Sequence, residues 1–499
     1  MKDIKYTRLD ELLDDNLEEF EPSESSITLK TVLIGIFLIG FFILFVFYFN
    51  TNLKLHADGK FSRRISMING KLKKLKYKNA TKFEDFYFRK SETQFLQCSE
   101  FLEDNQTSID QYVSHGRLRR DKNTTFPLKM DCDSIKTRLF GDLPAFESLG
   151  KSIAFVRNAY TLYELQEVFL SMNWHPDHFF CYALDRKSDE KMKKSMRKLD
   201  ECFENVIVLE KEYDFDRKGH RQDLAHFDCL ERLLDRNWSH AITLQNFDML
   251  IKTPRQLSDL SDLLNYTSIM GFDYGLKDRY DVTADWTPAG MKLLKNETGV
   301  PQEILHKKMV VRKSLNEVIL SKMFVKSIFE KLNIDKVIQR FDDDKRFGVD
   351  EMMIMTLYEN YLGLDGQMES NCVKEREDKL TRLNYWNLNQ PDGVNPDCKS
   401  NWLRHSLCVF GVEYLKEISE SPMVLGIFFV ESEFDLLMFS ANKVVEDFDF
   451  GTVLCVREMM KSGKTGKNPD TDWLASNFPQ FREMEIKANG TFVRGSIEC

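Results

Sequence analysis

One cluster of acidic side chains has a composition that could bind a divalent cation. Asp342, Asp343 and Asp344 follow one another between two segments with helical patterns. Mg²⁺ and Mn²⁺ prefer carboxylate oxygens as ligands, so metal coordination is one interpretation of this cluster. Consecutive aspartates also occur in solvated loops, and a solvated loop is the interpretation that we prefer.

Local motifs for several other chemistries are missing from the chain. There is no glycine-rich phosphate loop of the form GxxxxGKS/T or GxGxxG, no HExxH motif, no paired CxxC motif and no Gly-x-Ser-x-Gly nucleophile elbow. Zinc chemistry therefore has no support in the sequence. A net charge of −9 argues against a nucleic acid partner, because such partners select basic surfaces.

The elements that would position a site alternate between strand and helix patterns. The strand-like segments are 152–158, 178–185, 205–210 and 240–245, and the helical segments are 161–172, 187–203 and 226–237. This alternation predicts an α/β fold with a mostly parallel sheet flanked by helices. Open sheets of this kind bind ligands beyond the carboxyl ends of their strands. The loops after Asp185 and Gln245 are therefore the first places to look for a site.

A long apolar segment precedes these elements. No charged residue lies between Lys30 and Lys54, and nearly every side chain from Thr31 to Phe49 is apolar. As a helix this segment would be roughly 28 Å long, enough to cross the hydrocarbon core of a bilayer. We expect an uncleaved signal anchor over 31–50, because a polar tail precedes it and no A-x-A cleavage site follows.

The anchor divides the chain into a cytosolic tail (1–30), a stem (51–95) and a large lumenal region. Basic residues just after the anchor would favour the opposite orientation. All ten cysteines and seven N-x-S/T sequons lie beyond the anchor, however, as an oxidising secretory lumen favours. The expected glycosylation sites are Asn79, Asn105, Asn123, Asn265, Asn296 and Asn489. We expect the seventh sequon, at Asn237, to be silent because its middle residue is tryptophan.

Six segments of the lumenal region resemble, in order, the core-2/I-branching β-1,6-N-acetylglucosaminyltransferase family, with features of its nematode members. They are FCYALDRK (180–187), ECFENVIV (201–208), NWSHAITLQNFDMLIKT (237–253), GVDEMMIMTL (348–357), RHSLCVFGVEYL (404–415) and FSANK (439–443). The resemblance implies a type II Golgi enzyme with a GT-A-type nucleotide-sugar-binding fold and an inverting sugar transfer. It places the catalytic domain at 96–460, followed by a C-terminal extension at 461–499.

The resemblance assigns the general base of such a transfer. Inverting transfer is an in-line displacement, so a carboxylate must take the proton of the attacking acceptor hydroxyl. Glu351 matches the family's Asp-Glu motif and takes this role; without the resemblance it would be interpreted as a carboxylate on a helix surface. We expect Asp350 beside it to stabilise a helix N-terminus or to support the base.

The departing UDP needs positive charge near its diphosphate. The resemblance implies that basic side chains supply this charge, so neither a metal nor a cofactor is expected. Lys443 matches the family's lysine. His405 occupies the family's arginine position and Arg404 stands one residue earlier, so both are candidates and we prefer Arg404.

Other positions border the site that the resemblance implies. Asp185 stands where a nucleotide ribose or base is expected, and Asp248 with Lys252 and Thr253 matches an Asp-x-x-x-Lys-Thr motif. For this motif a structural role is the alternative to substrate contact. Trp386 matches a tryptophan at the acceptor subsite, whereas the tyrosine that some members carry two residues later is Leu388 here.

The resemblance also implies four disulfides. The pairs are Cys98–Cys455, Cys132–Cys202, Cys181–Cys229 and Cys398–Cys408. Cys372 and Cys499 remain, and they are free, paired with each other or used to link protomers.

These observations predict a Golgi type II membrane enzyme that transfers N-acetylglucosamine from UDP-N-acetylglucosamine to a glycan or glycoprotein acceptor, forming β-1,6 branches. Two alternatives stay open. One is a xylosyltransferase of the same fold, and the other is a non-catalytic glycan-binding membrane glycoprotein on a transferase scaffold.

Overall fold

The structure is a computed structural model that describes most of the region after the expected anchor and stem. The described residues are 87–120, 127–141, 146–271, 273–343, 345–368, 381, 398–404, 407–421, 425–427 and 449–490. They belong to one compact unit, 77–499. The expected tail (1–30) and anchor (31–50) lie outside the described residues. Within the described ranges, no helix is long and apolar enough to cross a membrane.

A five-stranded sheet with the order β3-β2-β1-β4-β8 forms the centre of this unit. The strands are β1 (Ile153–Ala159), β2 (Phe179–Asp185), β3 (Val206–Tyr213), β4 (His240–Leu244) and β8 (Ile319–Ser321). The first four strands run parallel, and β8 pairs antiparallel with β4. The predicted α/β class with a mostly parallel sheet is confirmed.

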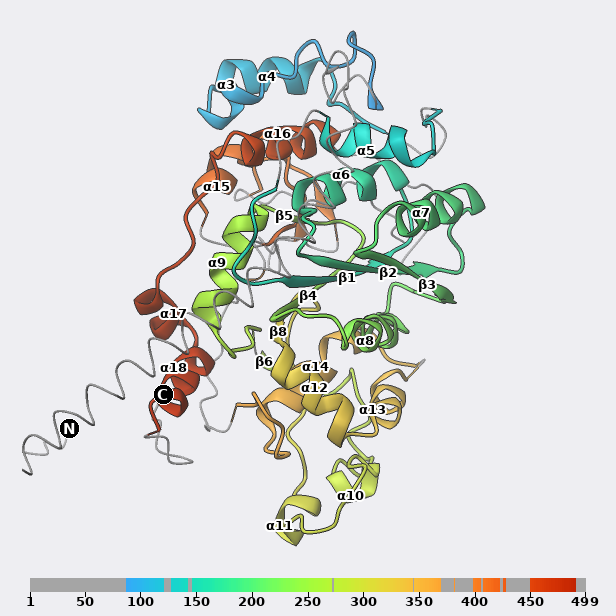
Figure 1. Cartoon of the computed structure of the whole chain (residues 1–499), viewed down its shortest axis with the longest axis vertical. Helices are drawn as coiled ribbons and strands as arrows, with labels where there is room; N and C mark the ends of the chain where they lie inside the picture. Colours follow the sequence, from blue (N-terminus) through green and yellow to red (C-terminus); the bar gives the residue numbers. More distant parts are fainter. Residues whose placement is uncertain are drawn as a thin grey trace, which may run out of the picture. The chain divides into compact units, whose positions relative to one another are not determined.

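Helices cover both faces of the sheet, with α6 and α7 on one face and α8 on the other (Figure 1). The bounds are α6 (Tyr163–Asn173), α7 (Glu190–Cys202), α8 (Gln222–Leu233) and α9 (Pro254–Leu264). Every side chain of β1 is buried, as expected for a central strand of a two-sided sheet. Successive residues face opposite ways, so Val156 packs in one core cluster with Phe227 of α8, and Phe155 packs in another with Met196 of α7.

The remaining helices and strands complete the described fold. They are α3 (Cys98–Leu102), α4 (Gln106–Ser114), α5 (Cys132–Phe140), β5 (Asp248–Leu250), β6 (Asp273–Tyr274), α10 (Pro288–Met291), α11 (Gln302–Leu305), β7 (Arg312–Lys313), α12 (Lys322–Lys331), α13 (Ile334–Phe341), η1 (Val349–Glu351), α14 (Met353–Glu359), β9 (Leu403–Arg404), β10 (Leu407–Cys408), η2 (Val412–Tyr414), α15 (Leu415–Glu420), β11 (Leu425–Ile427), α16 (Phe450–Lys461), α17 (Thr471–Asn477) and α18 (Pro479–Ala488).

All four predicted disulfides are present. Their Cα–Cα distances are 5.0 Å for Cys98–Cys455, 5.2 Å for Cys132–Cys202, 5.6 Å for Cys181–Cys229 and 5.5 Å for Cys398–Cys408. Cys372 and Cys499 lie outside the described residues.

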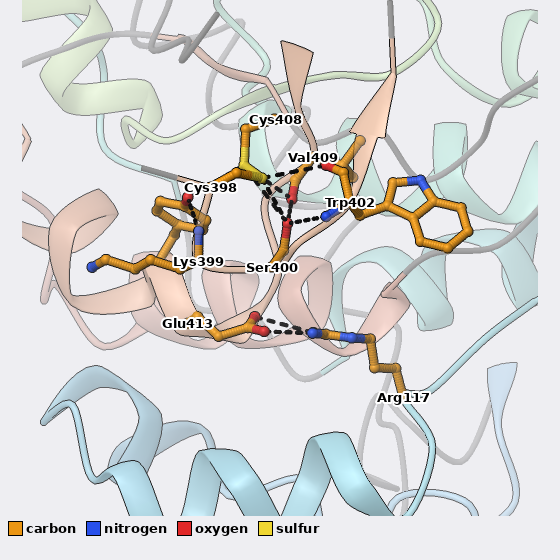
Figure 2. Close-up of a disulfide and its surroundings, with 9 residues drawn as sticks. Arg117, Cys398, Lys399, Ser400, Trp402, Cys408, Val409 and Glu413 are labelled. Carbon is orange, nitrogen blue, oxygen red and sulfur yellow. Dashed lines mark hydrogen bonds and ion pairs between the residues drawn. A yellow bond between two sulfur atoms is a disulfide. The ribbon is translucent and has the colours of Figure 1, made fainter. Parts of the chain in front are cut away.

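Figure 2 shows how the Cys398–Cys408 bridge is embedded. Ser400 lies inside the short loop that the bridge closes; its Oγ donates to the Val409 carbonyl and accepts a hydrogen bond of 3.3 Å from the Trp402 amide. Below the bridge, Arg117 donates to Glu413 of η2, with an Nη1–Oε2 distance of 3.0 Å. These contacts join the chain after α4 to the last third of the domain.

The C-terminal extension packs on the catalytic core. Leu474 of α17 and Phe481 of α18 belong to the same buried cluster as Phe155 of β1. In addition, the buried Lys252 donates from Nζ to the carbonyl oxygens of Ser421 and Gly466, at 2.9 and 2.8 Å. The described part of 461–499 is therefore an integral layer of the fold.

Candidate active site

A tight turn places Glu351 at the carboxyl side of the sheet. Gly348 has a φ of +63°, a conformation that favours glycine, and it directly precedes η1. The amides of Gly348 and Val349 both donate to the Lys218 carbonyl, at 2.7 and 3.2 Å, so the loop after β3 holds this turn. The backbone of Glu351 is held as well, because the Ser314 amide donates to the Glu351 carbonyl at 2.8 Å.

Two cations contact the Glu351 carboxylate. Arg279 donates from Nη1 to Oε2, and the Nζ of Lys313 lies 3.3 Å from the same oxygen. The side chain of Glu351 is 20% exposed. The contacts of both cations are made to Oε2, and no hydrogen bond to Oε1 is present among the described residues.

Asp350 connects this turn to the end of strand β4. Its Oδ2 accepts hydrogen bonds from Asn316 Nδ2 and, at 3.4 Å, from Nε2 of Gln245, which directly follows β4. Burial, and next the charge of Glu351, raise the pKa of Asp350 to about 7. Asp223 on α8 is also buried. Burial, and next the negative charge of Asp350, raise the pKa of Asp223. A carboxyl group that prefers its neutral form thus stands directly behind Glu351.

Four polar side-chain atoms around this edge are buried and form no hydrogen bond with the described part of the chain. They are Asn158 Oδ1, Gln222 Oε1, Asn246 Nδ2 and Asn316 Oδ1. Asn158 is near the end of β1 and Asn246 follows β4, whereas Gln222 begins α8. Buried polar atoms are normally paired. These atoms give the carboxyl edge capacity to bind the polar groups of a ligand.

Asp185 ends β2 at the same edge. Its Oδ1 accepts the Lys187 amide at 3.0 Å, and the Nζ of Lys187 lies 4.0 Å from Oδ2. Burial raises the pKa of this carboxyl. The expected contact with a nucleotide stays a prediction, and the position at a strand's carboxyl end is compatible with it.

Asp248 and Lys252 have structural contacts. Asp248 is buried, and its Oδ2 accepts the Gln245 amide at 2.6 Å, which closes the turn from β4 to β5. Thr253 caps α9 in a reciprocal capping box with Gln256. Lys252 is held by carbonyl oxygens, and burial lowers its pKa to about 8. These contacts match the structural interpretation of the Asp-x-x-x-Lys-Thr motif, and a donor contact of Asp248 stays a prediction.

Comparison with known proteins identifies the family. The model of the core-2/I-branching enzyme family matches residues 153–419, which is more than half of the chain. The chain belongs to the core-2/I-branching enzyme family. The resemblance found in the sequence is therefore confirmed, and with it the assignment to a family of enzymes.

Relatives of this family member are distant. A β-1,3-galactosyl-O-glycosyl-glycoprotein β-1,6-N-acetylglucosaminyltransferase 3 from Rattus norvegicus is 24% identical over 180 residues, covering 34% of this chain and 41% of the relative. A probable enzyme 7 of the same type from Sus scrofa is 31% identical over 84 residues, covering 16% and 20%. The chain thus spans less than half the length of these relatives.

Two solved glycosyltransferase-related structures show weak overall similarity to the chain. Staphylococcus aureus TarS 1-349 gives a TM-score of 0.24 at 12% identity, covering 42% of this chain and 56% of TarS. Core-mannan synthase A from Aspergillus fumigatus gives a TM-score of 0.23 at 12% identity, covering 51% and 84%.

Several residues that the family resemblance assigns lie outside the described residues: His405, Lys443, Trp386 and Leu388. Arg404 is described only by its backbone, which pairs with Leu407 in the β9–β10 hairpin. The proximity of these residues to Glu351 therefore stays a prediction.

Two aspartates of the acidic cluster, Asp342 and Asp343, form ion pairs with arginines. Arg221 Nη1 contacts Oδ2 of Asp342, and Arg346 Nε lies 3.5 Å from Oδ2 of Asp343. Asp344 is outside the described residues. In the described ranges, no group of three or more His, Cys, Asp or Glu side chains is arranged to share a metal ion.

Four of the expected glycosylation sites are exposed: Asn105, Asn265, Asn296 and Asn489. Asn79 and Asn123 lie outside the described residues. Asn237 is also exposed, but Trp238 within its sequon is buried and donates from Nε1 to the Leu233 carbonyl at 2.6 Å. The expectation that Asn237 is silent stays a prediction.

Sequence reasoning missed Arg279, Lys313 and Asn316. These residues reach Glu351 or Asp350 from the long segment between α9 and α12, which carries no recognisable motif. Two of the three are single cations in a segment with many charged residues, and residue type alone does not single them out.

Proposed function

We propose that the protein is an inverting glycosyltransferase with a GT-A-type fold that transfers N-acetylglucosamine from UDP-N-acetylglucosamine to a glycan acceptor. The observation that carries the proposal is the position of Glu351, a partly exposed carboxylate at the carboxyl side of the parallel sheet, held by Arg279 and Lys313. The names of the relatives support the transferred sugar, the β-1,6 linkage and an acceptor that carries β-1,3-linked galactose on an O-glycosylated protein.

The reaction proceeds as one displacement at the anomeric carbon of the donor sugar. The acceptor hydroxyl oxygen attacks this carbon, and Glu351 takes the hydroxyl proton as the new C–O bond forms. The bond to the diphosphate breaks, and its electron pair leaves with UDP. Arg279 and Lys313 contact Oε2, so Oε1 is the oxygen that we assign to receive the proton.

The two cations also fix the base in one orientation. A positioned carboxylate within reach of the hydroxyl acts far more effectively than a mobile one. Asp350 adds to this, since its hydrogen bonds to Asn316 and Gln245 tie the Glu351 turn to β4.

We propose that the developing charge on UDP is neutralised by Lys443 and Arg404, without a metal ion. The ion pairs of Asp342 and Asp343 with arginines support this choice, because they occupy the carboxylates of the acidic cluster. His405 is the alternative to Arg404.

We further propose a type II protein of the Golgi membrane with its catalytic region in the lumen. The four disulfides support an oxidising compartment, and the exposed sequons are accessible to glycosylation. Digestion of sealed microsomes by added protease should spare the catalytic region, and an endoglycosidase should reduce its mass. A catalytic region that the protease removes from sealed microsomes would overturn this orientation.

The activity is tested with the full chain in detergent and three donors: UDP-N-acetylglucosamine, UDP-xylose and UDP-galactose. We expect UDP to be released from UDP-N-acetylglucosamine only, and only when a suitable acceptor from a glycan array is present. Excess EDTA should leave the rate of this release unchanged. Preference for UDP-xylose would replace the proposal by a xylosyltransferase. Loss of all activity in EDTA would overturn metal independence, and no binding or turnover of any donor would favour the non-catalytic glycoprotein.

A further inference from the structure

Two large apolar side chains are exposed beside the residues that hold Glu351. Phe347 is 50% exposed and Leu276 is 43% exposed. Single exposed apolar residues are ordinary on protein surfaces. These two differ because both adjoin Arg279: its Cζ lies 5.9 Å from the centre of the Phe347 ring, and its amide donates to the Leu276 carbonyl at 2.9 Å.

The segment that carries Phe347 is held firmly against the segment that carries Arg279. Arg346 donates from Nη1 to the Asp278 carbonyl at 3.2 Å. On the other side of Phe347, a Cβ added to Gly348 would lie only 2.5 Å from Arg279 Nη1, so the guanidinium packs directly on the backbone there. The backbone on both sides of Phe347 is therefore held in place, and Arg279 separates the exposed ring from Glu351.

A pyranose ring fits this combination of groups. Its C–H face is apolar and its hydroxyls point outward around the rim, so an aromatic ring can cover the face while polar groups bind the rim. Aromatic rings make large contacts at a small cost in side-chain entropy. Arg279 connects the two groups, because it lies over the Phe347 ring and contacts the Glu351 carboxylate.

We propose that Phe347 forms a subsite that binds the C–H face of a hexopyranose of the acceptor. The inference rests on the proposed function and specifies the class of acceptor group that the site takes. The subsite holds the sugar that bears the attacking primary hydroxyl, so Phe347 contributes to acceptor affinity and leaves donor binding alone.

The molecule offers a matched control. Tyr266 is another exposed aromatic residue, at 53%. It adjoins Thr267, whose carbonyl contacts His240 at the start of β4, so it lies at the amino edge of the sheet, opposite Glu351. Tyr266→Ala also preserves the N-x-T sequon of Asn265.

The test compares the wild-type full chain with Phe347→Ala, Phe347→Tyr and Tyr266→Ala. The donor is UDP-N-acetylglucosamine and the acceptor probe is the p-nitrophenyl glycoside of β-1,3-galactosyl-N-acetylgalactosamine. We expect Phe347→Ala to raise the KM for the probe by roughly tenfold, the size of one lost aromatic contact. The KM for the donor and its slow hydrolysis without acceptor should stay unchanged. Phe347→Tyr and Tyr266→Ala should behave as wild type.

Other outcomes overturn the subsite. An unchanged KM for the probe in Phe347→Ala would do so, and a fall in kcat at constant KM would show that Phe347 acts only through Arg279. Saturation-transfer NMR of the same probe separates this inference from the proposed function, because it needs no turnover. If the wild type contacts the sugar C–H protons and Phe347→Ala does not, the subsite is supported even when the wild type transfers no sugar. Equal contact in the wild type and in Phe347→Ala would refute the subsite.

Discussion

At the amino edge of the central sheet, the buried His240 uses both ring nitrogens: Nδ1 lies 2.6 Å from Ser261 Oγ and Nε2 lies 3.2 Å from the Thr267 carbonyl. At the carboxyl edge, Asp350 is also buried, but its neighbour in the chain is a second carboxylate, Glu351. Burial favours the neutral form of both groups, which lowers the pKa of His240 to about 4 and raises that of Asp350 to about 7.

We call the amino edge around His240 the structural edge, and the carboxyl edge around Asp350 and Glu351 the functional edge. The polar groups around His240 pair with one another and hold β4 to α9. Around Asp350, carboxylates are crowded together and several polar atoms have no partner in the described chain. Such an arrangement costs stability and is typical of sites that bind charged or polar ligands.

The largest effect that would test this contrast is expected from Glu351→Gln. The amide keeps the shape of the side chain but cannot take the hydroxyl proton, so transfer should fall by roughly 10²–10⁴-fold. Binding of UDP-N-acetylglucosamine, measured by calorimetry, should survive. Glu330→Gln on the exposed side of α12 is the control and should keep full activity. Equal turnover of the Glu351→Gln and wild-type chains would remove Glu351 from the base role.

The next effect concerns the pH dependence of stability at the carboxyl edge. Asp350 has a folded pKa of about 7 against a usual 3.8, so its contribution to stability is complete below pH 3.8 and is lost as the pH rises to 7. Asp350→Asn removes this dependence. The wild type should therefore lose about 4 kcal/mol relative to the variant between pH 4 and pH 7, measured by denaturant unfolding. A constant difference between the two chains would contradict the buried, neutral carboxyl.

His240→Asn should show the opposite sign at the amino edge. The folded pKa of about 4 lies below the usual 6.5, so the contribution of His240 is complete above pH 6.5 and is lost as the pH falls to 4. The stability advantage of the wild type over the variant should shrink by about 3 kcal/mol over this interval. The same unfolding series measures it, and a growing advantage at low pH would refute the assignment.

The smallest effect is a packing test beside Asp350. An added Cβ at Gly219 would lie 1.9 Å from Oδ1 of Asp350, whereas one at Gly299 meets nothing within 4 Å. Both glycines have positive φ, +91° and +79°, so the strain of the backbone is similar. Gly219→Ala should therefore destabilise the fold by about 1–3 kcal/mol more than Gly299→Ala. Equal unfolding midpoints would show that Asp350 moves aside freely.

Much of the structural edge could be predicted from the sequence, because strand periodicity is local. The segments 152–158, 178–185 and 240–245 correspond closely to β1, β2 and β4. Strand β3 extends to Tyr213, beyond the predicted residue 210, because it is the edge strand and can expose charged residues such as Glu210 and Lys211.

Less of the functional edge could be predicted from the sequence. Strand β8 has three residues, too few for a periodic pattern, and the sequence did not indicate it or its antiparallel pairing with β4. Arg279 meets Glu351 across 72 residues, and neither residue type nor spacing indicates such a pair in one sequence. Helix α8 begins at Gln222, earlier than the predicted 226, because Arg221 adopts a left-handed conformation and starts the helix there.

The bridge between Cys98 and Cys455 turns most of the described domain into a closed covalent ring, since these cysteines are 357 residues apart and lie in α3 and α16. A single protease cut anywhere inside the ring leaves both fragments attached to each other. Such nicked molecules would migrate as intact chains on a gel until a reductant is added, so damage acquired in an extracellular or lumenal environment need not release either piece of the enzyme.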